Sequence, residues 1–272
     1  MDDKERSRKK AIIVFIYFLI FAIIAVLLYF WFFPKATCFD KIKNQNEEDV
    51  DCGGVCKKCE KIVAQDLVVN KAGAVETGTP GQFDFYAEVY NPNNSFGSKS
   101  FDYEFVFKNA SGEKISSVKG KDFILPGEQK YIVELNASSV VEFSSVDFNI
   151  TNSQWVEFND YYEKPQLKIT NKSYSESNTA DIFGSAHGLL KNDSPYDFSQ
   201  IKIKVILRDA NDNILALNST EVKTVKTGEE REFTVLWPKK FSGTVMKVDV
   251  QPEVNIFDSE SFMQKYFKAQ AF

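Results

Sequence analysis

Four cysteines are the residues best able to do chemistry in this chain of 272 residues, and all of them lie between positions 38 and 59. Cys38, Cys52, Cys56 and Cys59 follow the spacing C-x13-C-x3-C-x2-C. In an oxidising compartment, thiols this close in sequence form two disulfides. Four cysteines allow three pairings, and the spacing leaves all of them open. We favour Cys38–Cys56 with Cys52–Cys59, because a Cys56–Cys59 bridge would close a very small ring.

Two metal sites compete with this interpretation. Four thiolates would suit zinc, but they would stay reduced only in a reducing compartment. Oxygen-bearing side chains crowd the interval between the first two cysteines, and Asp40, Asn44, Glu47 and Asp51 are the candidate calcium ligands. The spacing does not match an EF-hand loop, so a solvated acidic loop is the favoured interpretation and we predict no cofactor.

The single histidine, His187, is the residue through which acid–base or Ser-His-Asp catalysis would have to run. No G-x-S-x-G elbow, phosphate-binding glycine loop or H-E-x-x-H motif accompanies it in the sequence. We therefore interpret His187 as a packed or surface residue and predict no catalytic residues. A carboxylate pair of the glycoside hydrolase kind stays open, because acids are plentiful and their separation in space is not written in the sequence.

The segment from Cys38 to Cys59 resembles a motif of bacterial surface and secreted proteins, C-x-D-G-I-x-N-x-x-E-x-x-V-D-C-G-G-x-C-x-x-C. The matching residues are Cys38, Asp40, Ile42, Asn44, Glu47, Val50, Asp51, Cys52, Gly53, Gly54, Cys56 and Cys59. Lys41 stands where the motif has glycine. The resemblance implies an extracytoplasmic spacer with no known chemistry.

An apolar segment, residues 11–33, precedes the cysteines and determines on which side of a membrane they lie. It holds no charged residue and no Gly, Pro, Asn or Gln. As a helix its 23 residues span about 34 Å, enough to cross a hydrocarbon core of about 30 Å. A cleaved signal peptide is the less favoured alternative, because the run is longer than usual and no A-x-A site follows. We predict an uncleaved transmembrane helix.

The charges that flank this helix predict its orientation. The first ten residues carry five basic side chains, whereas the other flank has three lysines offset by acids. Basic flanks stay in the cytoplasm, so we predict a single-pass protein of the cell membrane with its C-terminal region outside. The net charge of −5 excludes nucleic acid as a partner on charge grounds. The predicted partners are the lipid bilayer and a protein or cell-envelope component.

Beyond residue 61 the sequence has the pattern of short strands. Runs rich in Val, Ile, Phe or Tyr are bounded by Gly, Pro, Asn or Ser. We predict strands at 62–69, 82–90, 101–107, 130–135, 146–150, 166–170, 182–190, 201–208, 213–217, 230–236 and 245–250. This pattern is typical of β-sandwiches. The predicted fold class is all-β, with one N-terminal transmembrane helix, a small disulfide-rich linker and two tandem Ig-like β-sandwich domains.

The two halves of this region follow one plan. Asn91 and Gly127 are 36 residues apart, and so are Asn192 and Gly228; each glycine is followed by glutamate. Each interval holds an apolar strand and a polar turn, and an alternating strand follows it. We interpret this as duplication of one module.

This plan resembles the FxLYD-type bacterial sandwich domain and, more loosely, the water-stress fold of late-embryogenesis-abundant proteins. Within residues 179–251, the match lies in Gly188, Leu190, Asn192 and Ser194, in VILRDANDN with Arg208 in place of Tyr, and in Thr227-Gly228-Glu229 with Thr in place of Pro. The first module fits through Tyr90-Asn91-Pro92-Asn93 and Leu125-Pro126-Gly127-Glu128. The resemblance implies a fold and no activity.

Together these features predict a membrane-anchored extracytoplasmic structural or binding protein rather than an enzyme. The alternatives are a cell-envelope enzyme of the glycan hydrolase kind and a lipid-binding carrier of the late-embryogenesis-abundant type. The predicted parts are a cytoplasmic head (1–10), the transmembrane helix (11–33), a cysteine-rich spacer (34–60), two sandwiches (61–164 and 165–257) and a tail (258–272). We expect the tail to fray, because a chain end lacks partners. The alternative is a short docked helix whose apolar stripe consists of Phe262, Tyr266, Phe267 and Phe272.

Overall fold

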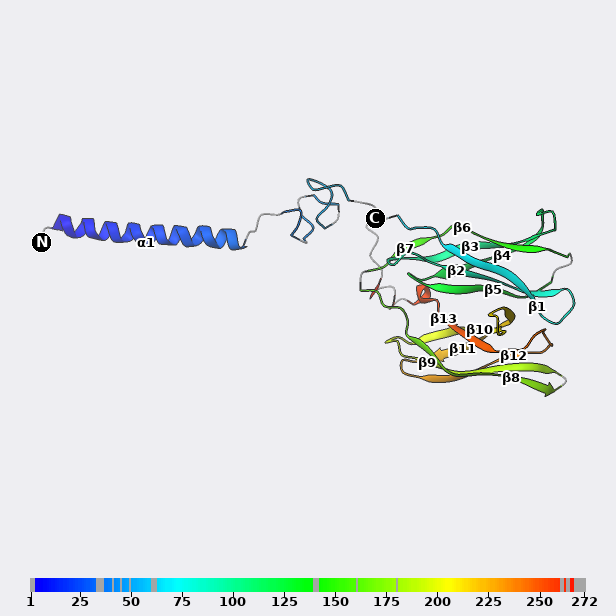
Figure 1. Ribbon diagram of the computed structural model, residues 1–272. Helices are drawn as coiled ribbons and strands as arrows, with labels where there is room; N and C mark the ends of the chain where they lie inside the picture. The colour runs from blue at the N-terminus through cyan, green and yellow to red at the C-terminus, as the bar shows by residue number, and fades with distance from the viewer. Residues whose placement is uncertain are drawn as a thin grey trace. The chain divides into compact units, whose positions relative to one another are not determined.

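The computed structural model describes residues 3–32, 37–40, 42–44, 46–48, 50–59, 63–138, 142–159, 161–179, 181–259, 262 and 265–266. The chain divides into two compact units, Met1–Val63 and Ala64–Phe272. The first unit begins with helix α1 (Asp3–Phe32) (Figure 1). From Arg8 to Tyr29 this helix is long and apolar enough to cross a membrane, and protein buries none of that window. A helix that is apolar all round needs an apolar surrounding.

The cysteine-rich module, residues 37–59, completes the described part of the first unit. Cys38 is bonded to Cys56 and Cys52 to Cys59, with Cα–Cα distances of 5.6 and 4.9 Å. This is the pairing that the ring-size argument favours. Gly53 has a φ of 78° and follows Cys52, so the chain reverses direction between two bonded cysteines.

The second unit consists of antiparallel sheets. Its first half contains β1 (Val68–Glu76), β2 (Gln82–Tyr90), β3 (Phe96–Lys108), β4 (Lys114–Ile124), β5 (Gln129–Ser138), β6 (Ser145–Thr151) and β7 (Trp155–Glu157). These strands form one sheet of order β1-β2-β5 and a second of order β4-β3-β6, with β7 paired to β3. Phenylalanines and other apolar side chains of β2, β3, β5 and β6 fill the space between the two sheets.

The second half repeats this architecture. It contains β8 (Leu167–Thr179), β9 (Ile182–Asn192), β10 (Phe198–Arg208), β11 (Ile214–Val225), β12 (Glu230–Trp237), β13 (Lys247–Glu253) and the 3-10 helix η1 (Ile256–Asp258). The sheets have the orders β12-β9-β8 and β11-β10-β13. Alternate residues of β10, from Ile201 to Leu207, pack against β9 and β12 to make the second core.

The two sandwiches stack face to face, so the second unit has four sheet layers (Figure 1). A third apolar cluster joins them: Tyr86 from β2 packs with Ile206, Ile214 and Leu217 from β10 and β11. Sheet β1-β2-β5 and sheet β11-β10-β13 are therefore covered on both faces. Strand β10 is continuously buried from Ile203 to Arg208 as a result.

The duplicated asparagines have the same structural role in both halves. Asn91 donates to the carbonyls of Phe96 and Leu125 at 2.7 and 2.9 Å, while its own Oδ1 accepts from the Asn93 amide. Asn192 donates to the carbonyls of Tyr196 and Val225 and accepts from the Ser194 amide. Both asparagines are fully buried. The repeated motif thus joins the turn after one strand to the end of another.

Two predictions of local structure are corrected. The strand predicted at 62–69 starts at Val68, and residues 63–67 have no regular structure. The tail does not fray where it is described: Phe262 and Tyr266 are 0% and 2% exposed, and the Tyr266 carbonyl accepts from the Asn159 amide. Burying these two aromatic rings favours docking of the chain end.

Candidate functional site

A buried cluster of charged side chains lies between the two sandwiches. The Glu253 carboxylate is 3.0 Å from the ammonium nitrogen of Lys130 and 2.5 Å from that of Lys204. Asp122 binds Lys130 at 2.8 Å. Lys130 comes from β5 and Glu253 from β13, so the cluster links the two halves of the unit. The two lysines are only 1% and 2% exposed, which makes this a desolvated network rather than a surface salt bridge.

Both ammonium groups have further partners. Lys130 donates to the Phe123 carbonyl at 2.8 Å and lies 4.0 Å from the centre of the Phe123 ring. Lys204 donates to the Tyr131 carbonyl at 2.7 Å. Because a buried charge is costly unless it is paired and hydrogen-bonded, these contacts allow two lysines to share one glutamate.

The network shifts the pKa values of its members in different directions. Burial tends to raise the pKa of Glu253, but the charges of Lys130 and Lys204 outweigh it and lower that pKa to about 2. Burial also opposes the charge of Lys130, yet Glu253 and Asp122 raise its pKa. The pKa of Lys204 is lowered, chiefly by burial and then by repulsion from Lys130. Glu253 is therefore a permanent anion at neutral pH.

The open edge of β5 is covered by side chains from the other sandwich. Gln251 accepts from the Tyr131 amide at 2.8 Å and donates to the Gln129 carbonyl at 3.0 Å. Arg208 donates to the Tyr131 hydroxyl at 2.9 Å and to Asp249 at 2.6 Å. An exposed edge strand would offer its free backbone groups to another chain. Here side chains of the neighbouring sandwich bind the backbone of Gln129 and Tyr131, so the start of the β5 edge is covered.

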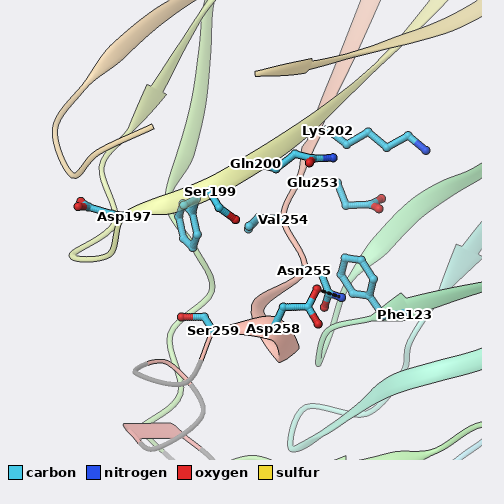
Figure 2. A pocket seen from close by; sticks show the side chains of 11 residues that line it. Phe123, Asp197, Ser199, Gln200, Lys202, Glu253, Val254, Asn255, Asp258 and Ser259 are labelled. Atoms are coloured by element: carbon cyan, nitrogen blue, oxygen red, sulfur yellow. Dashed lines mark hydrogen bonds between the residues drawn. The ribbon is translucent and has the colours of Figure 1, made fainter. Parts of the chain in front are cut away.

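A polar cleft of 480 Å³ opens beside this network (Figure 2). Phe123 from β4 forms one wall, and the start of β10 together with the chain after β13 forms the rest. Its polar lining includes Ser199, Gln200, Lys202, Asn255, Asp258 and Ser259. Asn255 donates to Asp258 at 2.8 Å, the contact dashed in Figure 2. The cleft therefore presents hydroxyl, amide and carboxylate groups beside one aromatic ring.

The chemistry of this cleft suits recognition through hydrogen bonds. A glycoside hydrolase needs a carboxylic acid whose pKa is raised so that it can protonate the leaving group. Glu253 has the opposite shift, because two lysines hold it as a carboxylate. Asp197 lies at the far end of the cleft from Glu253 in Figure 2. Glu253 therefore lacks the raised pKa that this acid role requires.

A smaller cavity of 150 Å³ contains a second unusual carboxylate, Asp84. Asp84 lies on β2, is 5% exposed, and accepts a hydrogen bond from the Asn136 amide at 2.8 Å. Burial raises the pKa of Asp84 to about 6, and the hydrogen bond only partly opposes this. The cavity is closed from the other side by residues of the second sandwich, among them Asn218 and Trp237.

The structure brings the four candidate calcium ligands together in the cysteine-rich module. Asp40 accepts from the amides of Thr37 and Ile42 and from the Asn44 side chain. Asp51 in turn accepts from the Asp40 amide at 3.0 Å. Glu47 accepts from the amides of Asn44 and Asp51. The three carboxylates therefore hold the loop through its backbone, as short polar side chains do in turns.

Calcium binding at this loop stays a hypothesis. The side-chain oxygen of Asn44 is buried without a hydrogen-bond partner, but the three carboxylates already accept N–H groups. Glu47 lies close to the sulfurs of Cys38 and Cys56. Those sulfurs form a disulfide and are not thiolates, so the group does not offer the ligands that zinc prefers.

His187 lies on the exposed face of β9. Its two ring nitrogens are 3.0 Å from the Thr234 hydroxyl and 3.1 Å from the Ser185 hydroxyl. No carboxylate within the described residues is hydrogen-bonded to this ring, and the arrangement lacks the acid that orients a catalytic histidine. This agrees with the interpretation of His187 as a surface residue.

Sequence reasoning did not identify Lys130, Lys204 or Glu253. In IKIKVILR, residues 201–208, the basic residues alternate with apolar ones, which is typical of a strand with one face in water. The structure places that face against the other sandwich. No local signal distinguishes a lysine that faces water from one that faces a second domain.

No known protein family matches the chain, and no curated protein matches it. Among solved structures, a β-glucuronidase of Bacteroides uniformis aligns with 65% of this chain at 11% identity and a TM-score of 0.18. The aligned part spans only 22% of that enzyme. The tandem CBM22-1–CBM22-2 domains of Xyn10C from Paenibacillus barcinonensis align with 75% of this chain and 91% of their own length, at 8% identity and a TM-score of 0.17. Likenesses this weak define neither fold nor function.

Proposed function

We propose that this protein is a membrane-anchored extracytoplasmic binding protein that presents two stacked β-sandwiches outside the cell membrane. One observation carries the proposal: an apolar helix with no protein around its Arg8–Tyr29 window is followed at once by two disulfides. The helix favours a bilayer as its surrounding, and the disulfides favour an oxidising compartment. The basic head favours a cytoplasmic N-terminus.

Its binding surface, in this proposal, is the polar cleft beside the Lys130–Glu253–Lys204 network. The two sandwiches are joined by apolar packing and by buried ion pairs, so the walls of the cleft are held at a fixed separation. A preformed site loses little conformational entropy when a ligand binds. The partner would be a protein or a cell-envelope component that offers hydrogen-bonding groups.

The alternatives receive less support. A lipid carrier needs an apolar cavity between its sheets, whereas Phe85, Phe101 and Phe105 in the first core and Ile201 and Ile203 in the second are fully buried. An envelope hydrolase needs an acid with a raised pKa in the cleft, and the pKa of Glu253 is lowered. We also propose that both sandwiches descend from an FxLYD-type domain, which the equivalent hydrogen bonds of Asn91 and Asn192 support.

Thiol labelling of the native chain tests the topology. Spheroplasts are treated with a membrane-impermeant maleimide, with or without an impermeant phosphine reductant. We expect labelling only after reduction, because all four cysteines are bonded and face outward. Labelling without reduction, or labelling that requires lysis, would contradict the orientation. The mass of the mature chain then shows whether residues 1–33 are retained, as an anchor requires, or removed, as a signal peptide would be.

Photo-crosslinking tests the cleft. A photoreactive amino acid replaces Ser199 in the cleft or, as a matched control, the exposed Ser175 on the open face of β8. After irradiation of native membranes, we expect a discrete adduct from position 199 and none from position 175. Equal adducts from both positions, or an adduct from position 175 alone, would show that the cleft is not the binding surface.

A further inference from the structure

The cysteine-rich module keeps its apolar side chains on the outside. Phe39 is 90% exposed, Val55 is 72% exposed and Ile42 is 59% exposed. Among the described residues of this module, the buried ones are Glu47 and Gly53, so the two disulfides stand where a larger domain would have an apolar core. Apolar residues that are scattered singly on a surface need no explanation. These three residues are not scattered, because they are grouped near one disulfide.

These apolar residues gather around the Cys38–Cys56 bridge. Phe39 follows Cys38 and Val55 precedes Cys56, and the two cysteine Cα atoms are 5.6 Å apart. Two further steps of about 3.8 Å place the Cα atoms of Phe39 and Val55 within about 13 Å of each other. The Ile42 amide donates to the Asp40 side chain at 2.9 Å, so Ile42 is held to the residue that follows Phe39.

The chain holds this bridge close to the end of the helix. Helix α1 ends at Phe32, and Cys38 comes six residues later. Six residues extend at most about 21 Å. The headgroup region on each side of a hydrocarbon core is about 5–7 Å thick. If the helix spans a bilayer, this short tether keeps the first disulfide near the membrane surface. A second copy of the chain is not tethered in this way and would have to diffuse to the module.

The polar groups of Asp40, the residue that follows Phe39, are paired inside the module. Both carboxylate oxygens of Asp40 accept hydrogen bonds, from the Thr37 amide and the Asn44 side chain on one oxygen and from the Ile42 amide on the other. Its own amide donates to Asp51. A loop whose polar groups are paired can enter a partly dehydrated interface at lower cost than one with free polar groups.

We propose that the outer membrane–water interface covers Phe39, Ile42 and Val55, so that the cysteine-rich module lies on the bilayer beside the end of the helix. This inference rests on the proposed function, because it needs the helix to be a retained anchor. The bilayer is the occupant because it is the apolar phase that the tether keeps within reach. The module then binds the membrane surface between the helix and the sandwiches, and it is not a freely extended spacer.

Depth-dependent quenching on the full chain tests this proposal. The chain is reconstituted in vesicles of phosphatidylcholine and phosphatidylglycerol, and a dansyl-bearing amino acid is introduced by codon suppression at position 39 or 55. Position 48 is the matched control, because Glu48 is an exposed polar residue of the same module. Mass spectrometry without reduction verifies both disulfides in each variant, which separates misfolding from loss of contact.

We expect lipids with a doxyl group near the headgroup to quench dansyl at positions 39 and 55 at least about twofold more than at position 48, with the reverse order for aqueous iodide. Equal quenching by iodide at all three positions would overturn the inference while the chain still floats with the vesicles. If dansyl at positions 39 and 55 were protected from both quenchers and crosslinking gave dimers, the inference would be overturned, because a second copy of the chain would then cover these residues. A chain that fails to float, or lacks residues 1–33, refutes the proposed function itself.

Discussion

At the scale of single residues, Asp84 is a charge that the fold disfavours. Its pKa is about 6 in the fold against an ordinary value of 3.8, because burial penalises the carboxylate. The folded state therefore binds this proton more tightly than the unfolded state does. The contribution of Asp84 to stability is most favourable below about pH 4, falls as the pH rises from 4 to 6, and stays unfavourable above 6.

Asp84→Asn removes that penalty and keeps an acceptor for the Asn136 amide. We expect the variant to be more stable than the wild type by about 1–3 kcal/mol at pH 8, and the gain to shrink toward pH 4, since one pKa unit corresponds to about 1.4 kcal/mol. Thermal unfolding in detergent at several pH values measures this difference.

Asp102→Asn is the matched control for that experiment. Asp102 binds Lys121 and the Asn152 side chain, and these hydrogen bonds lower its pKa. Neutralising it should lower stability or leave it unchanged at neutral pH, and the effect should vanish in acid. If both variants shift the unfolding temperature in the same direction at pH 8, burial does not set the pKa of Asp84.

The role of Asn192 could be predicted from the sequence only in part. Its place in a repeated pattern marked it as a turn residue, but its hydrogen bonds to the Tyr196 and Val225 carbonyls could not be predicted. Asn192→Ala leaves two carbonyls and the Ser194 amide without their partner. We expect a loss of about 2–4 kcal/mol in urea unfolding, because buried unpaired polar groups cost about 1–3 kcal/mol each and part of the loss relaxes.

Asn94→Ala provides the comparison for this loss. Asn94 is exposed in the equivalent turn of the first half. A surface substitution of this kind changes stability by less than about 0.5 kcal/mol. Similar midpoints for the two variants would mean that the buried asparagine is dispensable and that the motif marks ancestry rather than stability.

At the scale of elements, the sequence predicted strands best where apolar alternation was regular. The runs 82–90 and 182–190 correspond closely to β2 and β9. Strand β4, residues 114–124, was not predicted, because KISSVKGKDFI has few apolar side chains and its three lysines pair with acids of β3. An edge strand needs only one partner and only one apolar face, so its pattern is weak.

A weak apolar pattern also made the predicted lengths of β8 and β11 too short. Both extend well beyond the predicted 166–170 and 213–217, to Thr179 and Val225. Their additional residues are mostly polar and pair with a central strand of the sheet. Backbone pairing with β9 and β10 is what keeps them extended. Such tertiary support is not visible in a window of the sequence.

At the scale of the whole second unit, the stacking of the two sandwiches was the feature furthest from prediction. The duplicated sequence pattern predicted two modules in tandem, but it did not indicate whether the two modules contact each other. The structure buries Tyr86, Ile206, Ile214 and Leu217 between them and adds the ion network at one side. Since the halves share an apolar interface, we expect them to unfold as one cooperative body.

Glu253→Gln tests this cooperativity. The substitution leaves Lys130 and Lys204 buried without their shared anion, and breaking a buried ion pair typically costs about 3–5 kcal/mol. Fluorescence of Trp155 reports the first half and that of Trp237 the second, in chains where the other tryptophans are replaced by phenylalanine. In the wild type both probes should give one urea midpoint. In Glu253→Gln the midpoints should fall and separate.

Glu230→Gln distinguishes a role at the interface from a general effect of lost charge. Glu230 is half-exposed and lies 3.7 Å from Lys191, a surface pair that contributes about 0–1 kcal/mol. Because the pKa of Glu253 is lowered to about 2 from 4.5, its contribution is complete above pH 4.5 and is lost as the pH falls toward 2. The difference between the two variants should therefore be large at pH 7 and small near pH 2. If Glu253→Gln were no less stable than Glu230→Gln at pH 7, the network would not hold the sandwiches together, and the cleft beside it would lack the rigid walls that the binding proposal requires.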